Sequence, residues 1–427
     1  MTSPAAGRAS AWARAEQAAR ASYGRLLALL AAPAGDLELA EDVLADAFEQ
    51  ALRRWPGSGV PDNPEAWLLT VARNRQRDVR RSAAHRTRAP LDAEAERRTA
   101  VALDAIDPES IPDRRLALLF VCAHPAIAAD VRTPLMLQTV LGLDARQIAQ
   151  AFAVPAPTMA QRLVRAKRRI RGARIPFAVP ERRQMAARLP AVLEAIYGAY
   201  AVDGWLVSGT TLRESLAAEA HYLAVTLAEL LGDEPEALGL AALLSFSLSR
   251  AAARRAAVFV PLEEQDPRAW DHALIRQGEQ YLRRAHALGA IGRFQLEAAI
   301  QSVHGARVTS GRTDWAALEE LYAALVAVAP SLGARVAFAA TIGRTEGPEA
   351  GLAALDAIGG TAIGRFQPAW ATRAHLLAAA GRDEEAQQAY AKAISLCTDP
   401  RVRAYLESRR SASLSGSARR PPASTAR

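Results

Sequence analysis

The strongest constraint on the fold is the stretch over residues 144–171, DARQIAQAFAVPAPTMAQRLVRAKRRIR, which has the form of a helix-turn-helix. Proline is tolerated only near the start of a helix, so Pro155 and Pro157 predict that a second helix begins there. Apolar residues then recur at helical spacing, and they predict one buried face. This face consists of Met159, Leu163, Ala166 and Ile170.

The other face of this second helix is polar and basic. Its members are Thr158, Gln161, Arg162, Arg165, Arg168 and Arg169. Side chains of this kind can hydrogen-bond base edges from the first turn of a helix and neutralise phosphates further along, as a recognition helix does in the major groove. A solvated basic helix gives the same pattern, so this segment alone leaves both interpretations open.

A second basic helix is predicted over residues 66–82, AWLLTVARNRQRDVRRS. It follows a loop rich in Pro and Gly, and Asn63 before Pro64 is expected to start it. One face carries Arg73, Arg77, Arg80 and Arg81, and the opposite face, predicted to be buried, carries Trp67, Leu68, Val71, Ala72 and Val79. Asn74 and Asp78 lie among the arginines, and an amide beside guanidinium groups suits reading a base edge.

A third helix, over residues 36–55, is acidic. Its carboxylates are Asp36, Glu38, Glu41, Asp42, Asp46 and Glu49, and its predicted apolar face is Leu39, Val43, Ala47 and Leu52. Acid this close to two basic helices is not expected to face DNA. We expect it to face a protein partner with a basic surface, and Phe48 is the candidate apolar anchor.

The net charge of +8 is concentrated in the first part of the chain. Residues 1–185 hold 28 Lys and Arg against 20 Asp and Glu, whereas residues 186–427 hold 25 of each. This asymmetry indicates an N-terminal part that meets a polyanion, and nucleic acid is the obvious candidate.

Composition excludes several other classes of protein. No apolar run approaches the roughly 20 residues that span a membrane, and the N-terminus lacks the pattern of a signal peptide, so we expect a cytoplasmic protein. Cys122 and Cys397 are expected to be free buried thiols. His124 lies near Cys122, but a zinc site needs four ligands and no second ligand pair accompanies them, so no metal or cofactor is predicted.

The pattern of breakers predicts an all-α chain in five parts. These are a helical unit over 1–83, a charged linker over 84–111, a second helical unit over 112–180, a large helical domain over 186–410 and a disordered tail over 411–427. Tetratricopeptide-like spacing is visible at Trp370, Leu377, Gly381, Ala386, Tyr390, Ala393 and Pro400. An irregular alanine-rich bundle is the alternative for this domain.

The order of these segments resembles the bacterial extracytoplasmic-function (ECF) sigma factors of the sigma-70 family. The resemblance rests on AEDVLADAFEQAL, NPEAWLLTVARNRQRD and QIAQAFAVPAPTMAQRLVRAKRRIR, in that order. VPDNPEAWLL, CAHPAI, PLEEQDPRAWD and FQLEAAI resemble the subgroup with a large tetratricopeptide-like C-terminal extension. The resemblance covers about residues 24–407.

The resemblance implies that residues 1–83 form sigma region 2 and residues 112–180 form region 4. Region 2 would bind the clamp helices of the largest polymerase subunit through Glu41, Asp42, Asp46, Phe48 and Glu49. It would melt and read the −10 element through Ser58, Asn63, Trp67, Arg73, Asn74, Arg77, Asp78, Arg80 and Arg81. Region 4 would read the −35 element through Thr158, Gln161, Arg162, Arg165, Arg168 and Arg169, and would meet the flap of the second largest subunit.

This implied sigma factor is not an enzyme, and the sequence carries no phosphate-binding glycine loop or nucleophile elbow. The chain departs from the family where Pro155 replaces a serine that caps the recognition helix in many members. Two other functions stay open at this point. One is a stand-alone helix-turn-helix regulator with a tetratricopeptide-like sensor domain, and the other is a tetratricopeptide scaffold that binds DNA weakly through its basic half.

Overall fold

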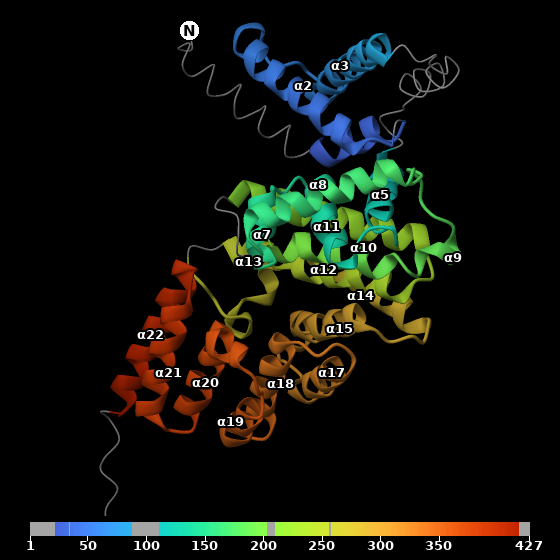
Figure 1. Cartoon of the computed structure of the whole chain (residues 1–427). Coiled ribbons are helices and arrows are strands. Elements are labelled where there is room, and N and C mark those ends of the chain that lie inside the picture. Colours follow the sequence, from blue (N-terminus) through green and yellow to red (C-terminus); the bar gives the residue numbers. More distant parts are fainter. Residues whose placement is uncertain (1–21, 34, 88–110, 203–209, 256–257, 418–427) are drawn as a thin grey trace, which may run out of the picture. The chain divides into compact units, whose positions relative to one another are not determined.

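A computed structural model shows a chain built from helices (Figure 1). It describes residues 22–33, 35–87, 111–202, 210–255 and 258–417. Within these ranges every regular element is an α-helix or a short 3-10 helix, which confirms the predicted all-α class. A helix long and apolar enough to cross a membrane is absent from the same ranges. The chain divides into two compact units, residues 1–230 and 231–427.

The first unit begins with a helical segment over 22–31. The helices that follow are α2 (Leu37–Ser58), α3 (Pro64–Thr87), α5 (Ile111–Cys122), α6 (Ala129–Thr139), α7 (Ala145–Ala151), α8 (Ala156–Gly172), α9 (Arg182–Met185), α10 (Leu189–Val202) and α11 (Thr210–Leu231).

The buried face of α2 differs from the predicted one. Val43 and Ala47 are buried as predicted, but Leu39 and Leu52 are only half-buried. The residues that α2 buries are Leu37, Ala40, Val43, Leu44, Ala47, Ala51 and Trp55. Three of these are alanines, which read as neutral in a hydropathy pattern yet let a neighbouring helix approach closely. The apolar stripe is therefore rotated away from Leu39 and Leu52, which stay partly open to solvent.

The predicted pair of helices around Pro155 is present as α7 and α8. Asp144 caps α7, because its carboxylate accepts the N–H groups of Arg146 and Gln147 while the Gln147 side chain returns to the backbone of Asp144. The turn that follows carries Ala153 in the left-handed region, at φ 51°. All four residues predicted for the buried face of α8 are buried: Met159, Leu163, Ala166 and Ile170.

The second unit continues the helical pattern. Its elements are α12 (Pro235–Ser249), α13 (Ala251–Arg255), η2 (Leu262–Glu264), η3 (Pro267–Ala269), α14 (His272–Ala287), α15 (Arg293–Gly305), α16 (Arg307–Ser310), α17 (Trp315–Val328), α18 (Leu332–Thr345), α19 (Pro348–Asp356), η4 (Thr361–Arg365), α20 (Gln367–Ala379), α21 (Asp383–Leu396) and α22 (Pro400–Ser417). Helix α12 is buried over most of its length and packs against α14 and α15. Its Glu236 carboxylate accepts the backbone N–H groups of Phe294 and Gln295 at the start of α15.

From α17 to α22 each helix packs against the next one in the chain. Four of the residues that suggested a tetratricopeptide-like repeat, Leu377, Ala386, Tyr390 and Ala393, share one core cluster. Gly381 has φ 76° and ends the turn between α20 and α21. This succession of paired helices suits a repeat architecture, and the tetratricopeptide assignment itself stays a prediction.

The described helices change some of the predicted boundaries. Helix α3 continues to Thr87, beyond the predicted end at 83, and residues 88–110 of the predicted linker lie outside the described residues. Helix α22 continues to Ser417, so the predicted disordered tail starts too early, and 418–427 lie outside the described residues. Helices α10 and α11 belong to the first compact unit, although the sequence pattern places 186–230 with the C-terminal domain. The five-part functional division stays a prediction.

Helices α18 and α19 cross at two glycines, which gives a test of this packing. A Cβ at Gly351 would lie 2.7 Å from the Cα of Gly343 and 2.9 Å from the carbonyl oxygen of Ala339. We expect Gly351→Ala to lower the free energy of unfolding by about 1–3 kcal/mol, because the helices must separate. Gly333→Ala on α18 is the control, since its Cβ would meet nothing within 4 Å and alanine favours a helix. Equal unfolding midpoints for the two variants would contradict the crossing.

Candidate nucleic-acid and protein-binding surfaces

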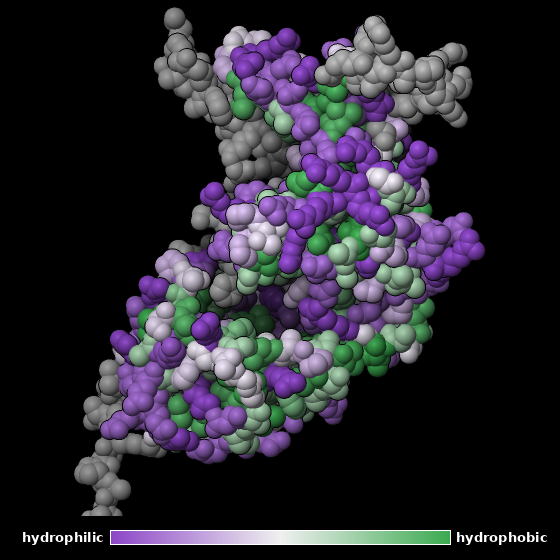
Figure 2. All heavy atoms as spheres, in the orientation of Figure 1, coloured by the Kyte–Doolittle hydropathy of each residue, from purple (hydrophilic) through white to green (hydrophobic). Residues whose placement is uncertain are grey.

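The polar face of α8 has an open N-terminal half. Thr158, Gln161 and Arg165 are exposed, and Arg162 forms an ion pair with Asp130 of α6 at 3.2 Å. Hydrophilic side chains gather over α8 in Figure 2. Pro155 is the N-cap residue and provides no side-chain cap, so the first N–H groups of α8 are free of a cap from that residue. This half presents hydroxyl, amide and guanidinium groups to solvent, and such groups can hydrogen-bond base edges.

The C-terminal half of α8 is paired with α2 instead. Lys167, which the sequence pattern did not single out, is buried with 7% of its side chain exposed. Its ammonium donates to the carboxylate of Glu41 at 2.6 Å. Glu41 was predicted to face a polymerase, and in this structure its partner comes from the chain itself.

Two exposed arginines extend this contact. Arg168 forms an ion pair with Glu38 at 3.3 Å, and Arg171 forms ion pairs with Glu38 at 3.1 Å and with Asp36 at 3.3 Å. Solvent-exposed pairs of this kind contribute about 0–1 kcal/mol each and weaken with salt. Arg168 was predicted to contact DNA, and here it lies on the acidic start of α2. Arg169 is exposed.

The environment of Glu41 balances burial against pairing. Burial raises the pKa of the Glu41 carboxyl, and the charge and hydrogen bond of Lys167 oppose this without cancelling it. A carboxyl whose pKa is raised by folding makes the fold less stable as pH rises from the unfolded pKa through the folded pKa. Lys167 therefore limits the cost of keeping an ionised carboxylate inside the first unit.

The other residues predicted for a polymerase interface lie along the outer side of α2. Asp42 is exposed, Phe48 is half-buried, and Glu49 pairs with Arg53 one turn further along. Together with Leu52 these residues line an open depression of about 620 Å³. An apolar floor bordered by carboxylates suits a partner that brings an apolar side chain and basic groups.

Asp46, the fifth of these residues, lies on the side of α2 that meets α3. Its carboxylate accepts a hydrogen bond from Arg75 at 2.7 Å. Arg75 was left out of the predicted arginine stripe, and so was Gln76, which is fully buried and donates to the carbonyl of Leu30. A polar residue in an otherwise charged run gives no hydropathy signal, so only the structure reveals it as core.

The loop before α3 and the face of α3 hold the residues predicted for the −10 element. Asn63 caps α3 by accepting the N–H of Ala66 at 3.0 Å, as predicted. Trp67 is half-buried and packs edge-on against Trp55. The remaining residues are either exposed or half-buried. Ser58, Asn74, Asp78 and Arg81 are exposed, and Arg73, Arg77 and Arg80 are half-buried.

Comparison with known proteins bears on these surfaces. Residues 18–86 match sigma-70 region 2, and residues 188–286 match a family of unknown function, DUF6596. Two strains of Mycobacterium tuberculosis have proteins described as the probable ECF RNA polymerase sigma factor SigI. Each of them is 30% identical to this chain over 164 residues, which cover 38% of this chain and 55% of the SigI protein. The N-terminal part of the chain is therefore a sigma-70 region 2 segment.

An uncharacterised protein of Rhizobium meliloti is 36% identical over 377 residues, which cover 87% of this chain and 89% of that protein. The similarity to the Rhizobium protein thus extends over most of both chains. No solved structure matches the chain. The region 2 match falls on α2 and α3, so the acidic helix and the arginine helix belong to one functional module.

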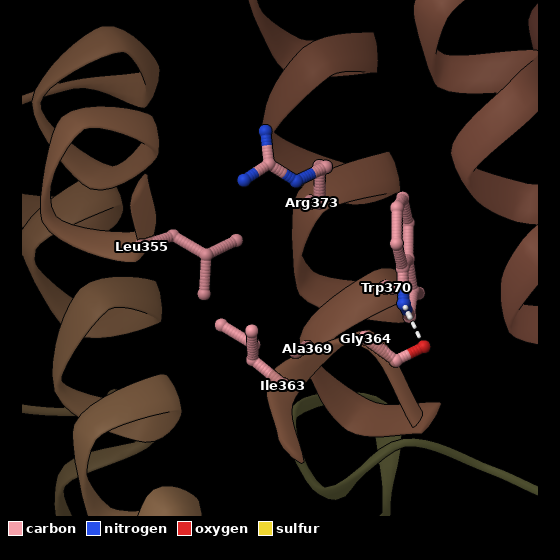
Figure 3. Close-up of a pocket in the computed structure, with 6 residues that line it drawn as sticks. All are labelled: Leu355, Ile363, Gly364, Ala369, Trp370 and Arg373. Carbon is pink, nitrogen blue, oxygen red and sulfur yellow. Dashed lines mark hydrogen bonds between the residues drawn. The ribbon is translucent and has the colours of Figure 1, made fainter. Parts of the chain in front are cut away.

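A small cavity in the second unit and the buried thiol of Cys122 are two further candidate sites. A cavity of about 190 Å³ lies between α19, η4 and α20, where Arg373 and Trp370 project from α20 and Leu355 faces them (Figure 3). Its single cation is already paired, because Arg373 binds Asp356. Elsewhere, burial raises the pKa of the Cys122 thiol to about 12, and the thiol lies 3.4 Å from the hydroxyl of Thr139, which suits a structural thiol.

The buried pair predicts a pH-dependent loss of stability in this protein. Lys167→Met leaves the Glu41 carboxylate without its counter-charge, so its pKa should rise further. We expect a loss near the lower end of about 3–5 kcal/mol at pH 7, shrinking toward pH 4.5 as Glu41 takes a proton. Calorimetry of the full chain at both pH values measures this.

The double variant Lys167→Met with Glu41→Gln should recover most of the lost stability, because neither charge is then left unpaired. Lys392→Met, on the exposed side of α21, is the matched control and should change little. A loss of the same size at both pH values would argue against the pairing.

Proposed function

We propose that this protein is an ECF-type sigma factor, which binds core RNA polymerase and directs promoter-specific initiation of transcription. The observation that carries the proposal is the match of residues 18–86 to sigma-70 region 2, in a unit that also holds the helix pair α7 and α8. A stand-alone regulator does not need region 2. The proposal assigns no catalysis to the chain, since the polymerase performs the chemistry.

In this proposal α3 and the loop before it melt and read the −10 element. The proposed contacts are Ser58, Asn63, Trp67, Arg73, Asn74, Arg77, Asp78, Arg80 and Arg81. Extruding a base from the duplex costs a few kcal/mol of stacking, so a pocket that replaces those contacts selects sequence while it opens DNA. The exposure of Asn74 beside half-buried arginines supports a division between base reading and phosphate binding.

Helix α8 would read the −35 element as part of region 4. Its open half, with Thr158, Gln161 and Arg165, supports base contacts, and Arg162, Arg168 and Arg169 would bind phosphates. Arg168 would have to leave Glu38 to do so. The cost is small, because both groups are partly exposed and exchange one ionic partner for another.

Core polymerase would bind through the outer side of α2. Glu41, Asp42, Asp46, Phe48 and Glu49 would meet the clamp helices of the largest subunit, and region 4 would meet the flap of the second largest. The open depression beside Phe48 supports this surface. The C-terminal helical domain, predicted over 186–410, would modulate activity.

The test is transcription in vitro with purified core polymerase, the full chain and a pool of promoter fragments. Transcripts that share −10 and −35 sequences are the expected result. Arg165→Ala should reduce discrimination at the −35 element and Asn74→Ala at the −10 element, each by about 1–3 kcal/mol if the side chain contacts a base. Competition between cognate and scrambled elements measures the discrimination.

Arg183→Ala is the control for both substitutions, because Arg183 is exposed on α9, outside both proposed DNA-binding surfaces, and forms an ion pair with nearby Glu181. Equal losses on cognate and scrambled promoters would refute base reading. Specific binding of duplex DNA without binding of core polymerase would replace the sigma factor by the stand-alone regulator.

A further inference from the structure

A loop of the second unit carries a motif that the proposed function leaves unused. Residues 258–271, VFVPLEEQDPRAWD, follow α13 and are called the strap here. The strap lies inside the segment that matches the family of unknown function. In Figure 1 it runs from α13 toward α22, α20 and α14 without forming a long helix of its own.

One end of the strap is firmly fixed. Trp270 is buried, and the guanidinium groups of Arg250 and Arg307 lie 5.8 and 5.7 Å from its ring centroid. Arg307 also donates to the backbone carbonyls of Leu262, Glu263 and Gln265, so it holds the main chain of the strap independently of the side chains of those three residues.

At the N-terminal end of the strap, side chains contact helices that lie much later in the chain. The ring of Phe259 packs edge-on against Tyr405 of α22, with ring centroids 5.3 Å apart. Glu263 forms an ion pair with Arg344 of α18, and the guanidinium of Arg344 lies over the ring of Trp315. The strap thus runs from α22 to α18, where Glu263 lies in the short 3-10 turn η2.

The helices under this end form a basic face, defined by Arg344 of α18 and Arg409 of α22, with the uncharged His375 of α20 between them. The charges of Arg344, Arg409 and Glu263 all act on the His375 imidazole, which places them around one spot. Arg409 and Glu264 likewise act together on the hydroxyl of Tyr405. Glu263 and Glu264, two of the carboxylates of the strap, therefore lie near this face.

The side-chain contacts on the basic face are weak ones. Phe259 keeps 37% of its surface exposed, and both partners of the Glu263–Arg344 pair are about two-fifths exposed. An exposed ion pair contributes about 0–1 kcal/mol, and an edge-on aromatic pair about 0.5–1.5 kcal/mol. The strap is part of the same chain, so its side chains are present at this face at an effective concentration in the millimolar range. Weak contacts are therefore enough to keep them bound.

We propose that the basic face is a docking surface for an acidic segment of a partner protein, in which an aromatic residue is followed four and five positions later by carboxylates. The strap occupies this surface in cis with that same pattern, Phe259 followed by Glu263 and Glu264. A partner segment displaces the side chains of Phe259, Glu263 and Glu264 while Arg307 and Trp270 keep the main chain of the strap attached. The proposal does not depend on the sigma factor role.

The test uses a fluorescent peptide with the sequence of residues 258–266 and the full chain, without polymerase or DNA. Binding is followed by fluorescence anisotropy. The unaltered chain should bind the peptide weakly, because its own strap competes. A chain with Phe259→Ala and Glu263→Gln should bind the peptide at least tenfold more tightly, since its strap no longer fills the face. Equal affinity of the two chains would overturn the proposal.

Arg344→Glu in the released chain should lose this binding by at least tenfold, and a peptide with arginine in place of Glu263 should restore it. Arg335→Glu is the matched control, because Arg335 is exposed on the same helix and outside the basic face. Restoration by the charge-swapped peptide also shows that the Arg344 variant is folded. Equal effects of Arg335→Glu and Arg344→Glu, or no restoration, would reject the basic face as the docking surface.

Discussion

The ion pair between Lys167 and Glu41 connects the basic helix α8 to the acidic helix α2 in the first unit. This pair is largely buried, so breaking it leaves an unpaired charge away from solvent and lowers the stability of the fold. The neighbouring pairs of Arg168 and Arg171 are more exposed, so their charges can be solvated by water instead at little cost in free energy. The position of Lys167 on α8 fixes which half of that helix turns toward α2 and which half stays open. The arrangement of the exposed polar face follows from this one contact.

The same contact links the two proposed activities of the first unit. An acidic helix suited to a basic protein surface and a basic helix suited to phosphates satisfy one another while neither partner is present. Binding of polymerase to α2 and of DNA to α8 would each remove the reason for the α2–α8 contact, so the two events should favour one another. Such coupling is thermodynamic and requires only that both partners compete for groups of the same contact.

Sequence patterns predicted the helices better than they predicted the partners of charged side chains. The buried face of α8 is confirmed at Met159, Leu163, Ala166 and Ile170, because helical periodicity there is carried by large apolar groups. The buried face of α2 was wrong at Leu39 and Leu52, since alanines carry much of the true interface. Periodicity detects hydrophobicity and misses small residues that act by close approach.

Charged residues show the limit of the sequence more clearly. Arg168 and Lys167 are neighbours in one basic run, yet one is exposed and the other is among the buried residues. Helical spacing places Lys167 beside the buried face, four residues after Leu163, but no local pattern identifies its partner, which lies 126 positions away in α2. Gln76 is a similar case, since its partner is a backbone carbonyl 46 positions away.

In both units, then, an acidic segment of the chain covers a basic surface of the same chain. Glu38 and Glu41 cover part of α8, and Glu263 and Glu264 cover the basic face of the second unit. A tethered acid acts at high effective concentration, so weak or untargeted polyanions cannot displace it, and only a partner that adds further contacts can. For a basic protein this arrangement would reduce nonspecific binding of polyanions at these two surfaces.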